Sequence, residues 1–129
     1  MTKKKKKDFI AGYKKRYDSW KKKSLNESGF FVIFNGFSEE KRPLSHKALL
    51  QEISGGALKL YIFLGIKSDN FTGESFYSIK SIANYFGKSE RTINNWFSEL
   101  EKLNLIYRAQ LEYNGVSHTY LQTYRTGKR

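Results

Sequence analysis

Residues 79–106, IKSIANYFGKSERTINNWFSELEKLNLI, carry the pattern that most constrains how this chain can fold. Apolar residues recur there every three or four positions on both sides of Gly87, which predicts two amphipathic helices over 79–86 and 89–103. Gly87 tolerates the left-handed backbone that ends one helix, and Ser89 is a favoured N-cap for the next. The pattern therefore predicts two short helices joined by a turn of a few residues.

Small and apolar side chains at the junction indicate how these helices pack. Ala83 lets the two backbones approach closely, and bulky apolar side chains fill the remaining angle. Those side chains are Ile82, Phe86, Ile93 and Trp96. We expect Phe97, Leu100 and Leu103 to extend the inward face of the second helix. Packing at a steep angle across a short turn is the geometry of a helix-turn-helix.

The second helix leaves polar side chains on or near its outer face, namely Glu90, Arg91, Asn94, Asn95 and Ser98. Arginine can bond guanine and asparagine can bond adenine, each through two hydrogen bonds in the major groove of DNA. The acidic Glu99 and Glu101 come only in the later turns, which would point away from a phosphate backbone. The sequence therefore predicts that this face reads base edges.

Amine and hydroxyl groups near the starts of both helices suit contacts with phosphate, because helix N-termini attract anions. They belong to Lys80, Lys88, Ser89 and Thr92. We expect these groups to fix the position of the protein on the DNA.

Residues 105–124 predict a β-hairpin. Two runs rich in Tyr, Thr and Leu flank Asn114-Gly115, and an Asn-Gly pair between such runs is the strongest short signal for a type I′ turn. Upstream, we expect a strand over 29–37, a helix over 45–52 and a minimal strand over 75–77.

A further helix is expected from Gly55 to Lys67, with Ser54 as its N-cap. Its residues are apolar on nearly all sides, so we expect it at the centre of the core.

The N-terminal region is strongly basic. Residues 1–23 hold eleven Lys and Arg against two Asp, a net charge of +9, out of +12 for the chain. We expect a mobile arm over 1–7 and an amphipathic helix over 8–23, which form one unit (1–23) beside a domain over 24–129. The apolar stripe of this helix consists of Phe9, Ile10, Tyr13, Tyr17 and Trp20.

Three partners for this stripe stay open: the domain itself, a second copy of the chain, or a membrane surface. We expect Phe9, Tyr13, Tyr17 and Trp20 to form a homodimer interface, because DNA-binding proteins of this size commonly bind paired half-sites. The basic charge favours a polyanionic partner, although a merely solvated basic tail is the alternative. The phosphate-binding candidates of the arm are Lys3, Lys4, Lys5, Lys6 and Lys7.

The composition argues against an enzyme and against a bound cofactor. The chain has no cysteine, so neither a disulfide nor a thiolate metal site can form. It has only two histidines and no phosphate-cradling Gly-Lys-Ser/Thr loop. No signal peptide or membrane-spanning run is evident, so we expect a cytoplasmic protein associated with the nucleoid or with a plasmid. We expect no catalytic residues and no metal site.

A resemblance to the bacterial winged helix-turn-helix DNA-binding domain covers residues 78–124. Their sequence is SIKSIANYFGKSERTINNWFSELEKLNLIYRAQLEYNGVSHTYLQTY. The passage ELEKLNLI and the hairpin after it look like the entrance to the wing of that family. Residues 29–67 look similar to parts of Gram-positive plasmid and phage replication initiators, and also of transcription regulators. The resemblance implies a mainly α fold with a small β-hairpin wing, here preceded by a basic N-terminal helix.

The resemblance also implies where DNA would lie. Helix 89–103 would enter the major groove, and the hairpin 105–124 would act as a wing beside it. The wing residues expected near DNA are Arg108, Tyr113, Asn114, His118 and Thr119.

The sequence thus favours a sequence-specific double-stranded DNA-binding protein, either a transcription regulator or a replication initiator. One alternative is a protein-interaction or replication-accessory module whose basic arm adds non-specific affinity for nucleic acid. RNA binding is a third possibility, although no aromatic stacking sheet is evident in the sequence.

Overall fold

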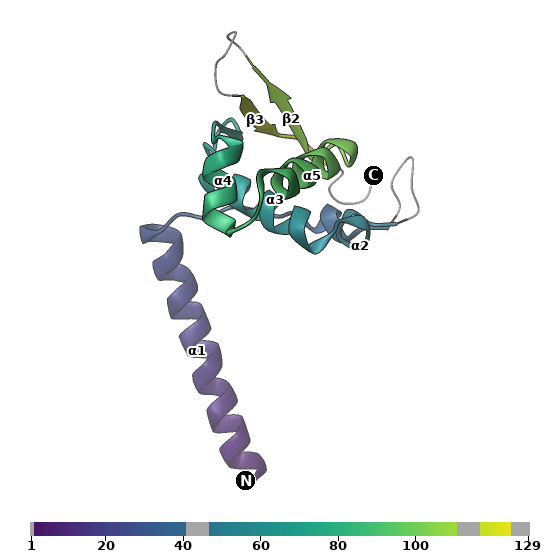
Figure 1. Cartoon of the computed structure of the whole chain (residues 1–129). Helices are drawn as coiled ribbons and strands as arrows, with labels where there is room; N and C mark the ends of the chain where they lie inside the picture. The colour runs from purple at the N-terminus through teal and green to yellow at the C-terminus, as the bar shows by residue number, and fades with distance from the viewer. Residues whose placement is uncertain (1, 41–46, 111–116, 125–129) are drawn as a thin grey trace. The chain divides into compact units, whose positions relative to one another are not determined.

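The computed structural model describes residues 2–40, 47–110 and 117–124. Its elements follow in the order α1 (Lys3–Glu27), η1 (Asn35–Ser38), α2 (Leu49–Glu52), α3 (Gly55–Lys67), β1 (Glu74–Ser75), α4 (Ile79–Phe86), α5 (Glu90–Lys102), β2 (Ile106–Ala109) and β3 (His118–Leu121) (Figure 1). The chain divides into two compact units, residues 1–30 and 31–129. Within the described ranges, no helix is long and apolar enough to cross a membrane.

α1 is longer than the helix that the sequence predicts over 8–23. It begins at Lys3, where the Thr2 hydroxyl accepts a hydrogen bond from the Lys5 N–H at 3.2 Å. Lysine is a good helix former, so the N-terminal lysines extend the helix once Thr2 caps it. The prediction of a mobile arm ahead of the helix is therefore wrong from Lys3 onward, and the helix ends at Glu27.

The strand predicted over 29–37 does not form. Residues 30–34 have no regular structure, and 35–38 form the short 3₁₀ helix η1. Phe31 and Phe37 instead pack against Tyr61, with ring centroids 5.6 and 5.5 Å apart. Two aromatic residues of the run that indicates a strand therefore pack on the core, whereas Phe30 and Phe34 are exposed.

Only part of the helix predicted over 45–52 is confirmed. Residues 45–46 lie outside the described ranges, 47–48 are not helical, and α2 begins at Leu49. The Ala48 N–H donates to Gln51 Oε1 at 2.8 Å, which closes the first turn.

α3 has the predicted bounds, and the Ser54 hydroxyl accepts a hydrogen bond from the Ala57 N–H at 3.2 Å. A Cβ on Gly56 would collide with the indole of Trp96, so this glycine allows α3 and α5 to pack closely. The expectation that α3 lies at the centre of the core is confirmed for its inner side, where Leu60 and Tyr61 are buried, whereas Ile66 on the outer side is exposed.

The predicted hairpin is confirmed, and a third strand joins it. β3 pairs antiparallel with both β2 and β1, giving the strand order β1-β3-β2. The minimal strand predicted over 75–77 is β1, at 74–75. The turn residues Asn114 and Gly115 lie outside the described ranges.

One hydrophobic core holds α3, α4, α5 and the sheet together. Its largest fully buried side chains are Tyr61, Phe97, Leu60, Leu64, Ile82, Ile93, Leu100 and Leu105. The core packs against one side of α5, and the opposite side of that helix is exposed to solvent. The fold is therefore mainly helical with a small antiparallel sheet, of which β1 precedes the α4–α5 pair and β2 and β3 follow it.

Candidate nucleic-acid interface

The turn between α4 and α5 has the predicted geometry. Gly87 adopts the left-handed conformation, with φ 65° and ψ 39°, and the Lys88 N–H donates to the Ala83 carbonyl at 3.0 Å. The Ser89 hydroxyl then accepts a hydrogen bond from the Thr92 N–H at 3.1 Å and caps α5. Both turn predictions are confirmed, because each depends on a local backbone requirement.

The predicted apolar seal between the two helices is also present. Ile82 and Ile93 have no exposed surface, and Ala83 is buried at the crossing. Phe86 and Trp96 meet edge to face, with ring centroids 5.6 Å apart. This packing fixes the angle of α5 relative to α4.

The outer face of α5 carries the predicted polar residues. Glu90, Arg91, Asn94, Asn95 and Ser98 are all exposed, and at 100° per residue they occupy an arc of about 140°. Within the described part of the chain, Arg91, Asn94 and Asn95 make no hydrogen bond or ion pair with other side chains. Their polar groups are therefore available to an external ligand.

The predicted phosphate-binding groups differ in how free they are. Lys80 and Lys88 are exposed, and neither has an ion pair within the described ranges. The hydroxyls of Ser89 and Thr92 lie 3.0 Å apart and bond each other, in addition to the cap. The two lysines are thus better placed than the two hydroxyls to meet a phosphate.

Glu99 has a role that sequence reasoning missed. Its Oε2 accepts a hydrogen bond from the Ser54 N–H at 2.6 Å, at the start of α3. A carboxylate at this position interacts favourably with the positive end of the α3 helix dipole. The two residues are far apart in the sequence, so no local signal indicates this contact.

The wing residue Arg108 faces the core side of the sheet. Its guanidinium lies 4.2 Å from the centre of the Phe97 ring, and its Nε is buried without a hydrogen-bond partner in the described residues. Burial lowers the pKa of Arg108, and the nearby Glu101 carboxylate opposes that shift. Arg108 therefore braces the hairpin against α5.

Thr119 is buried as well, with only 3% of its surface exposed, so its side chain is not open to a ligand here, and its expected place near DNA stays a prediction. It pairs with Arg108 across the strands and shares the same inner face. The reason is the two-residue alternation of a strand, which sends neighbouring side chains to opposite faces.

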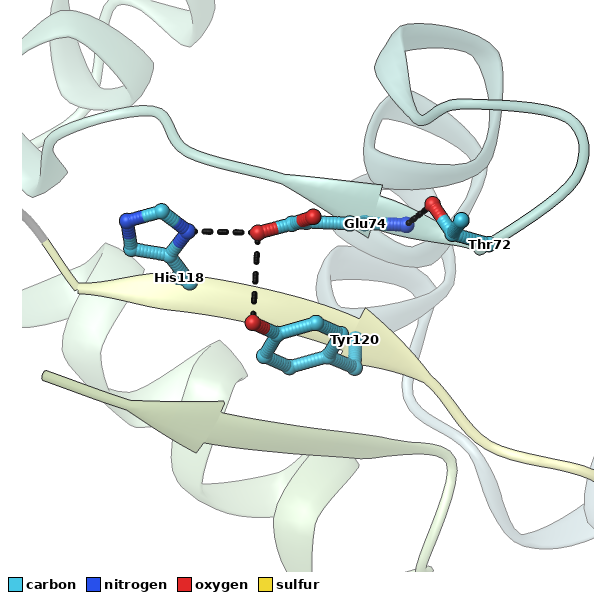
Figure 2. Close-up of polar contacts among 4 residues, drawn as sticks. All are labelled: Thr72, Glu74, His118 and Tyr120. Atoms are coloured by element: carbon cyan, nitrogen blue, oxygen red, sulfur yellow. Dashed lines mark hydrogen bonds and ion pairs between the residues drawn. The ribbon is translucent and has the colours of Figure 1, made fainter. Parts of the chain in front are cut away.

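His118 lies on the outer face, where it contacts Glu74 (Figure 2). His118 Nδ1 lies 2.6 Å from Glu74 Oε2, and the Tyr120 hydroxyl donates to the same oxygen at 3.2 Å. We call Glu74, His118 and Tyr120 the wing brace, because they tie β3 of the wing to β1. Sequence reasoning missed Glu74, since its partners depend on strand register.

Two further wing candidates, Tyr113 and Asn114, lie outside the described ranges. In the described part of the wing, therefore, Arg108, His118 and Thr119 are all engaged in internal contacts. The outer sheet face also carries aromatic side chains, with Tyr107 and Tyr120 ring centroids 6.4 Å apart.

The unit formed by α1 carries the five predicted phosphate-binding lysines, Lys3, Lys4, Lys5, Lys6 and Lys7, all exposed. The stripe residues Phe9, Tyr13, Tyr17 and Trp20 are 56–65% exposed, and α1 has no buried residue. Arg16 lies 4.4 Å above the centre of the Tyr13 ring. Within its own unit, the aromatic stripe is thus uncovered.

Comparison with known proteins gives a match over the part of the chain that contains α4 and α5. Residues 51–106 match a family model described as a helix-turn-helix domain, which spans α3, α4 and α5. No curated protein and no solved structure matches the chain significantly. The described residues contain no group of three or more His, Asp or Glu able to hold a metal ion.

Proposed function

We propose that this chain, which contains a helix-turn-helix DNA-binding domain, is a sequence-specific double-stranded DNA-binding protein that acts as a transcription regulator or a replication initiator. α5 enters the major groove, the wing lies beside it, and the N-terminal lysines contact phosphate. In this role the protein is not an enzyme, and it works in the cytoplasm on chromosomal or plasmid DNA.

One observation carries the proposal. α5 is fixed by buried contacts on its inner side, while Arg91, Asn94 and Asn95 stand unpaired on its outer side within the described structure. Such side chains match the hydrogen-bonding pattern of guanine and adenine in the major groove. A polar helix face that only contacts solvent does not require these residue types. It also gives no reason for the turn that holds α5 or for the lysines of α1.

The deciding experiment is affinity selection of random and genomic duplexes by the full-length protein, followed by sequencing. It is run at about 150 mM salt, where non-specific phosphate binding is already weakened. We expect a discrete motif, and its position near promoters or near an origin distinguishes a regulator from an initiator. Recovery of duplexes without a shared motif would contradict the proposal.

The protein also acts as a homodimer in this proposal, with the α1 stripe as its interface. Two observations support it: the stripe aromatics are more than half exposed, and α1 buries nothing within its own unit. Light scattering of the full chain and of a chain lacking residues 1–23 tests it. A truncated chain that keeps the mass of a dimer would rule out α1 as the interface.

A second candidate function is a protein-interaction or replication-accessory module with non-specific affinity for nucleic acid. It is favoured by the exposed apolar side chains of the second unit, among them Phe34, Phe71 and Tyr85. Under this alternative, the selection experiment returns no motif, and DNA binding depends on the lysines of α1 alone.

A further inference from the structure

The outer side of α3 presents an apolar strip that the core does not cover. Lys59, Ile62 and Ile66 lie within an arc of about 60° on this helix at 100° per residue. Ile66 is 63% exposed and Ile62 is 37% exposed. The inner side of the same helix is buried in the core, and neither isoleucine belongs to that core cluster.

This strip borders a groove between α3 and α4. The groove has a volume of about 310 Å³ and is lined by Lys59, Ile62, Phe63, Ile66, Lys67, Tyr85 and Phe86. Its aromatic wall is held together by ring contacts, because the centroid of the Phe63 ring lies 4.9 Å from that of Tyr85 and 5.6 Å from that of Phe86. Tyr85 nonetheless keeps 68% of its surface exposed.

The charges of the groove select its occupant. Lys59 and Lys67 flank the apolar surface, no lining residue is acidic, and neither lysine has an ion pair within the described ranges. They lie eight positions apart on α3, about 12 Å along its axis. An occupant with carboxylates at a similar spacing and apolar side chains between them complements this surface.

The same charges disfavour α1 of a second copy as the occupant. Its aromatic stripe is flanked by lysines, and residues 1–23 carry a net charge of +9. Like charges brought together at an interface weaken binding. A groove flanked by lysines therefore fits a partner with acidic flanks.

The groove is also separate from the surface proposed to meet DNA. On α4, Tyr85 is about 140° away from Lys80 around the helix axis. None of the polar residues on the outer face of α5 lines the groove. An occupant of the groove therefore leaves Arg91 and Asn95 accessible.

We infer that the groove between α3 and α4 is a docking site for an acidic amphipathic helix of a partner protein. Apolar side chains of that helix cover Ile62, Ile66 and Tyr85, and its carboxylates meet Lys59 and Lys67. The inference goes beyond DNA binding, and the site works whether or not α5 reads a DNA sequence.

The test uses two fluorescein-labelled 16-residue helical peptides and the full-length protein. One peptide has three leucines on one face, between two glutamates eight positions apart, and the other has lysines in place of the glutamates. Fluorescence anisotropy at about 150 mM salt measures both affinities. We expect the glutamate peptide to bind the wild type about tenfold or more tightly than the lysine peptide.

Charge reversal makes the test specific. In Lys59→Glu/Lys67→Glu we expect the preference to reverse in favour of the lysine peptide, and in Lys59→Gln/Lys67→Gln we expect it to disappear. The control Lys14→Glu/Lys15→Glu changes the net charge by the same amount on α1 and should keep the wild-type preference. Ile66→Ser should weaken the glutamate peptide by about tenfold, because it removes exposed apolar contact area.

Equal affinity for both peptides would overturn the inference, and so would a loss of preference in the α1 control as large as in the groove variant. Changes in amide chemical shift that the peptide causes mainly in α5 would overturn it as well. Binding of the selected duplex by the Lys59→Gln/Lys67→Gln variant is measured in parallel. Normal duplex binding with lost peptide preference supports the docking site. A failed duplex selection with intact peptide preference affects only the proposed DNA-binding function.

Discussion

α5 and the wing both offer polar side chains, but they use them differently. On α5, Arg91 and Asn95 have no internal partner in the described structure, whereas in the wing Arg108 covers Phe97 and His118 contacts Glu74. An arginine is thus free of internal partners in one region and supports the fold in the other. The comparison teaches that a polar residue near a helix proposed to bind DNA is a candidate reader of bases only if the fold leaves it free.

The largest expected effect comes from Phe97, which supports both regions. It is buried in the core, and its ring carries the Arg108 guanidinium. Phe97→Ala should lower the free energy of unfolding by about 3–5 kcal/mol, because it leaves a cavity and removes that platform. Urea denaturation measures the loss. A loss below about 1 kcal/mol would show that the two regions do not share this support.

Substitutions on α5 sharpen the comparison next. Arg91→Ala and Asn95→Ala should each cost about 1–3 kcal/mol of discrimination for the selected duplex against single-base variants. They should hardly change the free energy of unfolding, since both side chains are exposed and unpaired in the described structure. Competition binding with a set of substituted duplexes measures the discrimination.

The matched control replaces Lys3, Lys4, Lys5, Lys6 and Lys7 by alanine. It should weaken binding to all duplexes alike and flatten the dependence of affinity on salt. A uniform loss from the α5 variants as well would disprove base reading by that helix.

The turn that sets the angle of α5 depends on Gly87. Gly87→Ala should cost about 1–2 kcal/mol of unfolding free energy, because φ is 65° there and a Cβ strains that conformation. Gly55→Ala is the control, since that glycine is helical and a Cβ on it meets nothing within 4 Å. Thermal unfolding compares the two. Equal effects would mean that the turn imposes no conformational demand.

The smallest expected effect concerns the wing brace. A double-mutant cycle of Glu74→Ala and His118→Ala should give a coupling energy of about 0.5–1 kcal/mol, because both side chains are partly exposed and solvent screens their contact. Urea denaturation of the four proteins gives that energy. A coupling energy of zero, together with unchanged DNA affinity of the His118→Ala variant, would mean that His118 is an ordinary surface residue.

The elements with strong local signals were predictable from the sequence. Ser54 and Ser89 cap helices, and Gly87 ends one, because each satisfies a demand of its own backbone. The hairpin was predictable for a related reason, since two alternating runs flank a favoured turn pair. These signals also placed the free side chains of α5, because helix periodicity separates its two faces.

The remaining features depend on contacts between distant parts of the chain. Phe31 lies in a run that favours a strand, but its ring packs against Tyr61 of the core, which is distant in the sequence. The register of β3 with β1 and β2 decides that Thr119, and not His118, faces the core. Glu99 meets Ser54 through the packing of α3 on α5. Each of these outcomes follows from tertiary structure, which overrides local preference.

The separation of the two sides of α5 has a consequence for how this protein can change. Exposed residues without internal partners can usually be replaced at a cost within about 0.5 kcal/mol. Arg91, Asn94 and Asn95 are of this kind in the described structure. Under the proposed function, new residues at these three positions redirect the protein to other DNA sequences with no compensating change inside the molecule. Under that function, target choice can diverge rapidly among descendants of this chain, or be reprogrammed by design, while the scaffold stays the same.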